Sequence, residues 1–337
     1  MKKTVIVDMM GGDNAPLEMV KGVAEAYGEF GSDVGYILVG DRAQIEKVAK
    51  DNSISLSPFE IVHTDCVIEM TDDPIQVVRG KESSSMSVGL RLLKEGKGDA
   101  FVSTGNTGAL FTGANLIVRK VKGVRRPAIA SLLPLQPPVL LADSGANIMV
   151  TPEYLEQFAI MGSAYMKNIM SVENPRVGLL NNGEEETKGT ELQIETYKLL
   201  RANENINFVG NIEGNRVMQD TCDVIIADGF TGNIFLKTLE GLGKMMLKTL
   251  KTTIYSTAKT RIAGLLIKDE MQGLKKTFDA RELGGAPILG ISKPVIKAHG
   301  SSDAKAFKNA IGQAIAFSAT NITEEIEAAI AASAKKV

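Results

Sequence analysis

The 337-residue sequence contains no tryptophan, only two histidines and only two cysteines. The two cysteines, Cys66 and Cys222, are too few for a disulfide scaffold, and their separation rules out the CxxC spacing of zinc or thiol redox sites. The two histidines, His63 and His299, cannot form a histidine-rich metal site within one chain. We therefore expect a protein of a reducing compartment whose cysteines are buried and inert.

A strong charge of one sign and long apolar runs are also missing. The net charge is −2, so the chain has no global basic field to hold nucleic acid. The first apolar stretch, Thr4–Val7, ends at Asp8 and is too short for a signal-peptide core. No run approaches the roughly 18 apolar residues of a membrane span. These absences predict a cytoplasmic protein with no nucleic-acid partner and no spanning helix.

Several enzyme fingerprints are absent. The sequence has no GxGxxG, GxxxxGK[ST], GxSxG or HExxH motif, which argues against the usual nucleotide, hydrolase and zinc-protease sites. The acidic run Glu184–Glu186 offers carboxylates that suit magnesium. The same charges also suit the start of a helix, because of the helix dipole. We prefer the second interpretation and predict no metal at this run.

What the sequence does contain is an alternation of strand-like and helix-like segments. Short apolar, β-branched runs predict strands at Thr4–Val7, Tyr36–Val39, Ile61–His63, Ala100–Val102, Val139–Ala142, Val177–Leu180, Asn207–Val209 and Val224–Ala227. Helical periodicity marks Leu17–Phe30, Ala43–Asp51, Met86–Glu95, Glu153–Asn168 and Glu191–Ala202. The alternation predicts a three-layer α/β/α fold with a mainly parallel sheet, as a single domain over residues 1–337.

Loops rich in Gly, Asn, Ser and Thr follow many of these strands. They are Met10–Asn14, Ser103–Gly108, Asp143–Asn147, Asn181–Gly183, Gly210–Gly214 and Asp228–Asn233. Any one of them is explained by turn chemistry, since Gly and Asn tolerate positive φ. Six in one chain favour a shared polar site, because helix starts at the carboxyl ends of parallel strands present free amides to anions.

The C-terminal third differs in character. Lys244–Lys276 holds eight basic and two acidic residues, a local charge of +6, with apolar residues at three- and four-residue steps. This pattern predicts an amphipathic helix or helical hairpin, which either lies on an anionic membrane surface or packs in a dimer or core with a solvated lysine face. Lys293–Ala298 is expected to form a last strand, and Asp303–Lys336 one closing helix.

Eight short motifs then occur in order along nearly the whole chain. They are DMMGGDNAP (Asp8–Pro16), STGNTGAL (Ser103–Leu110), LADSGAN (Leu141–Asn147), VGLLNNGEEETKG (Val177–Gly189), FVGNIEG (Phe208–Gly214), ADGFTGN (Ala227–Asn233), GGAPILG (Gly284–Gly290) and AHGSS (Ala298–Ser302). Together they resemble the acyl-ACP:phosphate acyltransferase family of bacterial phospholipid synthesis. One position departs from the family pattern, because Asn14 stands where histidine is usual.

The resemblance implies a fold similar to isocitrate and isopropylmalate dehydrogenases and to phosphotransacetylases, a homodimer, and no metal or nucleotide cofactor. It implies transfer of a fatty acyl group from acyl carrier protein to inorganic phosphate, which yields acyl phosphate. By match of motif, Lys188 and Asn233 correspond to the family's functional lysine and asparagine. A metal-dependent dehydrogenase and a non-enzymatic membrane scaffold stay open as alternatives.

The implied chemistry fits these residue types. Phosphate is already an anionic nucleophile and a thiolate leaves readily, so the protein must position phosphate and stabilise an oxyanion. Lys188 offers charge and Asn233 an N–H donor, worth roughly 3–4 kcal/mol per donor in comparable sites. Residues expected to bind substrate or phosphate are Asp8, Gly11, Gly12, Asp13, Ser103, Gly105, Asn106, Thr107, Asp143, Asn147, Asn181, Thr231, Gly232 and His299.

A lipid product gains from delivery at the bilayer, so the basic segment is expected to touch the inner face of the cell membrane. Its apolar residues Leu265, Leu266 and Ile267 are the predicted membrane contact. The expected partners are acyl carrier protein, inorganic phosphate, a second copy of the chain and, peripherally, membrane lipid.

Overall fold

The computed structural model describes residues 2–269, 271, 273 and 280–334. The strands form one sheet and are β1 (Lys3–Asp8), β2 (Val34–Gly40), β3 (Glu60–His63), β4 (Ala100–Ser103), β5 (Ala128–Leu133), β6 (Val139–Ala142), β7 (Arg176–Asn181), β8 (Asn207–Glu213), β9 (Val224–Ile226), β10 (Ala286–Leu289) and β11 (Val295–Lys297). Their order across the sheet is β3-β2-β1-β4-β11-β10-β5-β6-β9-β7-β8.

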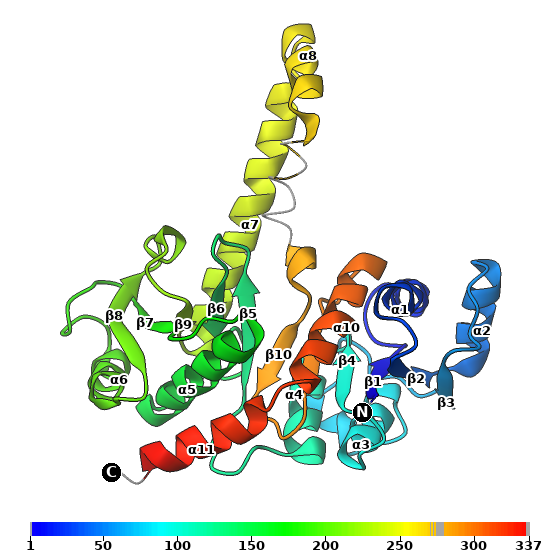
Figure 1. Cartoon of the computed structure of the whole chain (residues 1–337), viewed down its shortest axis with the longest axis horizontal. Helices are drawn as coiled ribbons and strands as arrows, with labels where there is room; N and C mark the ends of the chain where they lie inside the picture. The colour runs from blue at the N-terminus through cyan, green and yellow to red at the C-terminus, as the bar shows by residue number, and fades with distance from the viewer. Residues whose placement is uncertain (1, 270, 272, 274–279, 335–337) are drawn as a thin grey trace.

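Helices cover both faces of this sheet (Figure 1). They are α1 (Leu17–Phe30), α2 (Arg42–Asp51), α3 (Ser85–Lys94), α4 (Thr107–Gly113), α5 (Pro152–Ile169), α6 (Glu191–Ala202), α7 (Gly229–Ile254), α8 (Ala258–Leu266), α10 (Ala304–Ser318) and α11 (Ile322–Ala334). In β1 the alternation of side chains is plain, because Val5 and Val7 join one apolar cluster and Ile6 joins another on the opposite face. The predicted three-layer α/β/α fold is confirmed.

The sheet consists of two parallel halves that run in opposite directions. Strands β3, β2, β1, β4 and β11 are parallel to one another, as are β6, β9, β7 and β8. Between them β10 and β5 pair antiparallel with each other and with their outer neighbours. The carboxyl ends of the two halves therefore lie at opposite edges of the sheet.

The two central strands β5 and β10 are missing from the strands expected from the sequence. Strand β10 is four residues long and contains Pro287, and neither strand alternates with a helix. The predicted loop Gly210–Gly214 was also wrong in part, because β8 continues through a bulge to Glu213, with Gly210 at a φ of 102°. These strands are fixed by pairing with distant partners, which short-range pattern does not encode.

The predicted single closing helix is two helices. Helix α10 ends at Ser318 and α11 begins at Ile322, without Gly or Pro between them. The hydroxyls of Ser318 and Thr320 donate to the carbonyls of Ile315 and Phe317, which satisfies the last turn of α10. Helix α10 packs on α1, and α11 packs on α5. The break therefore lets the C-terminal segment pack against helices of both halves of the sheet. Residues 335–337 lie outside the described residues.

The basic segment forms a helical hairpin that projects from the body (Figure 1). Its first helix begins earlier than expected, because α7 starts at Gly229, and α8 folds back beside it. Leu266 is 80% exposed, and Leu265 and Ile267 are exposed as well. Within the described residues no helix combines the length and apolar character needed to cross a membrane. Residues 270, 272 and 274–279 of the predicted projection lie outside the described residues.

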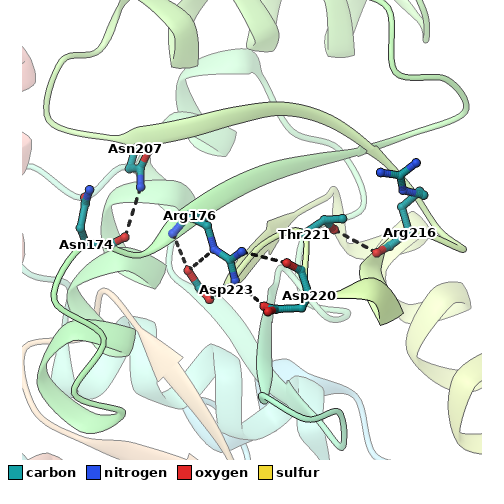
Figure 2. Close-up of polar contacts among 7 residues, drawn as sticks. All are labelled: Asn174, Arg176, Asn207, Arg216, Asp220, Thr221 and Asp223. Atoms are coloured by element: carbon teal, nitrogen blue, oxygen red, sulfur yellow. Dashed lines mark hydrogen bonds and ion pairs between the residues drawn. The ribbon is translucent and has the colours of Figure 1, made fainter.

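An ion-pair cluster joins the amino ends of β7 and β9 (Figure 2). The Arg176 guanidinium donates to both carboxylate oxygens of Asp223, at 3.0 and 2.8 Å, and to Asp220 at 2.6 Å. Burial disfavours the Asp223 anion, but the hydrogen bonds from Arg176 outweigh it and hold the pKa of this carboxyl below its usual value. The cluster fixes the amino ends of two parallel neighbours, opposite the loops that follow these strands.

Candidate functional site

The predicted polar loops form two groups, because the two halves of the sheet run in opposite directions. The first, here the N-terminal loop cluster, comprises Asp8–Asp13, Ser103–Thr107 and Ala298–Ser302, after β1, β4 and β11. The second, here the cavity loop cluster, comprises Asp143–Asn147, Asn181–Gly189 and Asp228–Asn233, after β6, β7 and β9. The single shared site expected from the six loops stays a prediction.

Asp8 is the buried centre of the N-terminal loop cluster. Its carboxylate accepts a hydrogen bond of 2.7 Å from the Ser103 hydroxyl and one of 3.1 Å from the Met10 N–H. Burial is the dominant influence and raises the pKa of Asp8 despite these bonds. The Ser103 hydroxyl also accepts from the Gly105 N–H at 3.0 Å. Both predicted site residues are thus used to hold neighbouring loops together.

Glycines allow these loops to interlock. A Cβ on Gly11 would lie 2.6 Å from the Gly105 nitrogen, so the two backbones touch directly. Gly12 has a φ of 87°, and a Cβ there would lie 2.7 Å from the Thr104 hydroxyl oxygen. The Asp13 N–H donates to the Gly300 carbonyl at 2.9 Å. Gly11 and Gly12 therefore allow the backbones of neighbouring loops to pack directly against each other.

The side chains of Asn106, His299 and Asn14 also bond within the protein. Asn106 caps α4, accepting from the Ala109 N–H, and donates to three carbonyls of residues 69–72. The His299 ring is exposed and its Nδ1 bonds Ser301. Asn14, in place of the usual histidine, donates to the carbonyls of Ser301 and Ser302, both at 3.2 Å. Thr107 lies exposed at the start of α4.

Lys297 is a buried charge that the sequence analysis missed. It lies at the end of β11, and its ammonium donates to the carbonyls of Thr104, at 3.1 Å, and Ala298. Burial lowers the pKa of Lys297 to about 8, while the charge of Asp8 acts in the opposite direction. A lysine that ends an apolar strand, Val295–Lys297, was the available sequence signal.

Asp143 organises the cavity loop cluster. Its buried carboxylate accepts from the backbone N–H groups of Ile129, Gly145, Ala146 and Asn147, and from the Asn147 amide at 2.8 Å. Asn147 also donates to the Pro127 carbonyl. Burial raises the pKa of Asp143 against the effect of these donors. Both residues shape the loop after β6.

The loop after β9 runs directly into α7, so Thr231, Gly232 and Asn233 lie in the first two turns of a helix. Asp228 caps that helix, accepting from the Phe230 and Thr231 N–H groups and from the Thr231 hydroxyl at 2.6 Å. Gly232 packs against the Asp143 carbonyl, where a side chain has no room. Asn233 is exposed beside Gly145, and the structure gives its amide no hydrogen-bond partner within the residues it describes.

Lys188 lies in the exposed loop between β7 and α6. Asn181 holds this loop by donating to the Lys188 carbonyl at 3.1 Å, and Asn211 donates to the Glu185 carbonyl at 2.8 Å. Within the described residues the Lys188 ammonium has no ion-pair partner. Strands β7 and β9 are parallel neighbours, so Lys188 and Asn233 belong to the same edge of the sheet, although no hydrogen bond of the described residues joins them.

In the acidic run Glu184–Glu186, the carboxylates of Glu184 and Glu186 bond to different partners. Glu184 pairs with Arg216 at 3.4 Å, and Glu186 accepts from the Tyr197 hydroxyl at 3.2 Å. Throughout the part of the chain that the structure describes, no group of three His, Cys, Asp or Glu side chains is close enough to hold a metal ion. The carboxylates of this run therefore brace a loop.

A cavity of about 280 Å³ opens at the cavity loop cluster. It is lined by Gly145, Ile148, Gly229, Phe230, Asn233, Ile234 and Lys237. Ile148, Phe230 and Ile234 each expose more than half of their surface, which is unusual for large apolar side chains beside a polar loop. A second cavity of about 260 Å³, between α3 and residues 116–117, contains none of the predicted site residues. The first cavity is the better candidate site.

A model of the fatty acid synthesis protein family matches residues 3–325. The chain belongs to that family. Among curated relatives, the phosphate acyltransferase of Dictyoglomus turgidum is 46% identical over 91% of this chain and 91% of its own length. The phosphate acyltransferase of Fusobacterium nucleatum is 46% identical over 96% of this chain and 97% of its own length. Family membership makes the protein an acyltransferase, in agreement with the resemblance found in the sequence.

Solved structures agree with the fold of this family member. A phosphotransacetylase from Streptococcus pyogenes matches with a TM-score of 0.65 and 17% identity, over 97% of this chain and 95% of that chain. A phosphotransacetylase from Staphylococcus aureus matches with a TM-score of 0.60 and 16% identity, over 96% and 94%. The expected likeness to the phosphotransacetylase fold is confirmed.

Proposed function

We propose that this acyltransferase moves a fatty acyl group from the thioester of acyl carrier protein to inorganic phosphate. The products are acyl phosphate, for phospholipid synthesis, and free carrier protein. The observation that carries the proposal is the cavity at the start of α7, where the amide of Asn233, which has no partner in the described part of the chain, lies beside apolar side chains. Such side chains suit an acyl group, and an amide N–H suits the oxygen of its carbonyl.

The proposed reaction needs no covalent intermediate on the enzyme. A phosphate oxygen attacks the thioester carbon, a C–O bond forms, and the carbonyl oxygen becomes an oxyanion that accepts a hydrogen bond from Asn233. The oxyanion then collapses, the C–S bond breaks, and its electron pair leaves with the carrier's sulfur as a thiolate, which solvent protonates. Lys188, with no ion-pair partner in the described structure, contributes positive charge at the same edge of the sheet.

The test is a reaction with labelled phosphate. Palmitoyl carrier protein, labelled phosphate and enzyme should give a labelled lipid that hydroxylamine destroys, with free carrier protein released only when phosphate is present. Absence of that lipid with active substrate would contradict the proposal. A nicotinamide cofactor that binds on spectroscopic titration would instead support the dehydrogenase alternative.

We further propose that the protein is a cytoplasmic homodimer that touches the inner face of the membrane with the tip of its helical hairpin. Leu265, Leu266 and Ile267 expose apolar surface there, in a segment of net positive charge. Wild-type protein should sediment with anionic vesicles, and Leu266→Glu should not. Thr249→Glu is the matched control, because it adds the same charge at an exposed position on α7. Equal binding by all three proteins would remove the membrane proposal, and light scattering tests the dimer.

A further inference from the structure

The cavity beside Asn233 contains one charge. Of its seven lining residues, Lys237 is the only charged one and Asn233 the only other with a polar side chain, while Ile148, Phe230 and Ile234 supply the apolar wall. About half of the Lys237 side chain is exposed, so an anion that enters the cavity can reach its ammonium. The cavity therefore combines one cation, one amide donor and an apolar surface.

Lys237 lies one helical turn after Asn233 on α7, which places both side chains on the same side of the helix. From that position its charge also reaches the N-terminal loop cluster, where it lowers the pKa of Lys297 and, after burial, that of His299. Helix α7 thus connects the two loop clusters, and Lys237 stands between them.

We infer that Lys237 binds a phosphate group of the substrates in this cavity, next to Asn233. The inference rests on the proposed function and adds a residue to it. Lys188 belongs to the loop after β7 and is not among the residues that line the cavity, and the Lys297 ammonium already donates to two backbone carbonyls. The phosphate group has two possible sources, free inorganic phosphate and the phosphodiester of the carrier protein's prosthetic arm.

A substitution at Glu240 should change phosphate affinity in the direction opposite to the loss of Lys237. Its carboxylate accepts from the Lys237 ammonium at 2.9 Å, in an ion pair whose side chains are 53% and 19% exposed for the lysine and the glutamate. An incoming phosphate must compete with this carboxylate for the ammonium. Glu240→Gln removes the competing charge and should strengthen phosphate binding, whereas loss of a merely structural contact would weaken it or leave it unchanged.

The first measurement is the affinity for inorganic phosphate alone, by isothermal titration calorimetry without carrier protein. Lys237→Met should weaken binding about ten-fold, as the loss of one charge-assisted hydrogen bond predicts, and Lys237→Arg should restore most of it. Glu240→Gln should tighten binding by about two- to five-fold, the range of a weak exposed ion pair. Lys248→Met is the matched control, since Lys248 lies on the same side of α7 about 16 Å further along.

The second measurement separates the two sources of phosphate. If Lys237 holds the acceptor, Lys237→Met raises KM for inorganic phosphate and leaves KM for acyl carrier protein unchanged; the reverse pattern assigns it to the prosthetic arm. Unchanged values of both KM, together with unchanged phosphate affinity, would overturn the inference. If Lys237→Met fails to fold, Glu240→Gln is tested in both measurements, and a Glu240→Gln variant that neither binds inorganic phosphate more tightly nor lowers KM for acyl carrier protein overturns the inference. Wild-type protein that binds phosphate but makes no acyl phosphate contradicts the proposed function instead.

Discussion

The N-terminal loop cluster and the cavity loop cluster are built from the same residue types and differ in what those residues leave free. In the first, Ser103 bonds to Asp8, Asn106 bonds to the carbonyls of residues 69–72, and Gly11 touches Gly105 backbone to backbone. In the second, the capping groups are equally satisfied, but the side chains of Asn233 and Lys188 have no hydrogen-bond partner among the described residues, and a cavity opens beside Asn233.

The difference shows that glycine-rich loops at strand ends serve two purposes in one protein. Where three loops converge, as after β1, β4 and β11, glycine removes side chains so that the loops fit together. Where a long helix starts, as after β9, Gly229 and Gly232 bring α7 close to the Asp143 loop and leave the next residue at the surface. Phosphate binding by the N-terminal loop cluster remains a prediction, as does catalysis by Lys188 and Asn233.

We expect the largest effect on activity at Asn233 and Lys188, whose side chains have no hydrogen-bond partner among the described residues. Asn233→Ala and Lys188→Ala should each lower kcat, for Asn233 by roughly 10²–10³-fold as for other oxyanion donors, because the transition state loses a donor or a charge. Thermal unfolding should change little, since neither side chain bonds within the described protein. Lys198→Ala, at an exposed ion pair on α6, is the control for Lys188. Near-normal turnover of either variant would make that residue structural.

A side chain added at a glycine of the interlocked loops should instead lower the free energy of unfolding. Gly11→Ala places a Cβ 2.6 Å from backbone atoms that have no room to move, and we expect a loss of about 1–3 kcal/mol in the free energy of unfolding. Gly28→Ala, at an exposed position of α1 where an added Cβ would have nothing within 4 Å, should be neutral or stabilising by about 0.5–1 kcal/mol. Urea denaturation of both variants measures the contrast. Equal stability of the two would show that the loops are looser than the structure indicates.

At the edge opposite the cavity, Asp223→Asn should cost roughly 1–3 kcal/mol near neutral pH. The pKa of Asp223 is lower in the folded protein, so its contribution is present above the unfolded pKa and disappears as the pH falls through the folded pKa. The stability difference between wild type and variant should therefore shrink in acid. Asp220→Asn, at the more exposed partner of Arg176, should have a smaller effect, and chemical denaturation from pH 7 to pH 3 tests both.

The smallest effect is expected from the cysteines. Cys222 is buried at the start of β9, away from the cavity, and burial raises its pKa to about 11, so it is a thiol rather than a nucleophilic thiolate near pH 7. The double variant Cys66→Ala, Cys222→Ala should keep its turnover, with a slightly lower melting temperature. Mass spectrometry after incubation with acyl carrier protein checks this directly, and an acylated cysteine would establish a two-step route.

The sequence determined the local structure and the family. Short apolar, β-branched runs predicted the strands from β1 to β9 except β5, helical periodicity predicted helices between them, and the order of short motifs indicated an acyltransferase. Strands such as Val5–Val7, apolar on both faces, and loops with Gly or Asn after them depend on neighbours in the chain. Preferences for strand and turn conformations are determined by short stretches of residues.

Only the tertiary structure decided which of those stretches meet. The antiparallel pair β5 and β10 reverses half of the sheet and so separates Asp8 and Ser103 from Asp143 and Asn233, which no local pattern records. Tertiary packing also buried Lys297, and it placed Lys237 in the cavity beside Asn233. Strand direction and burial arise from contacts between residues far apart in the chain, where pairing and desolvation energies outweigh local propensity.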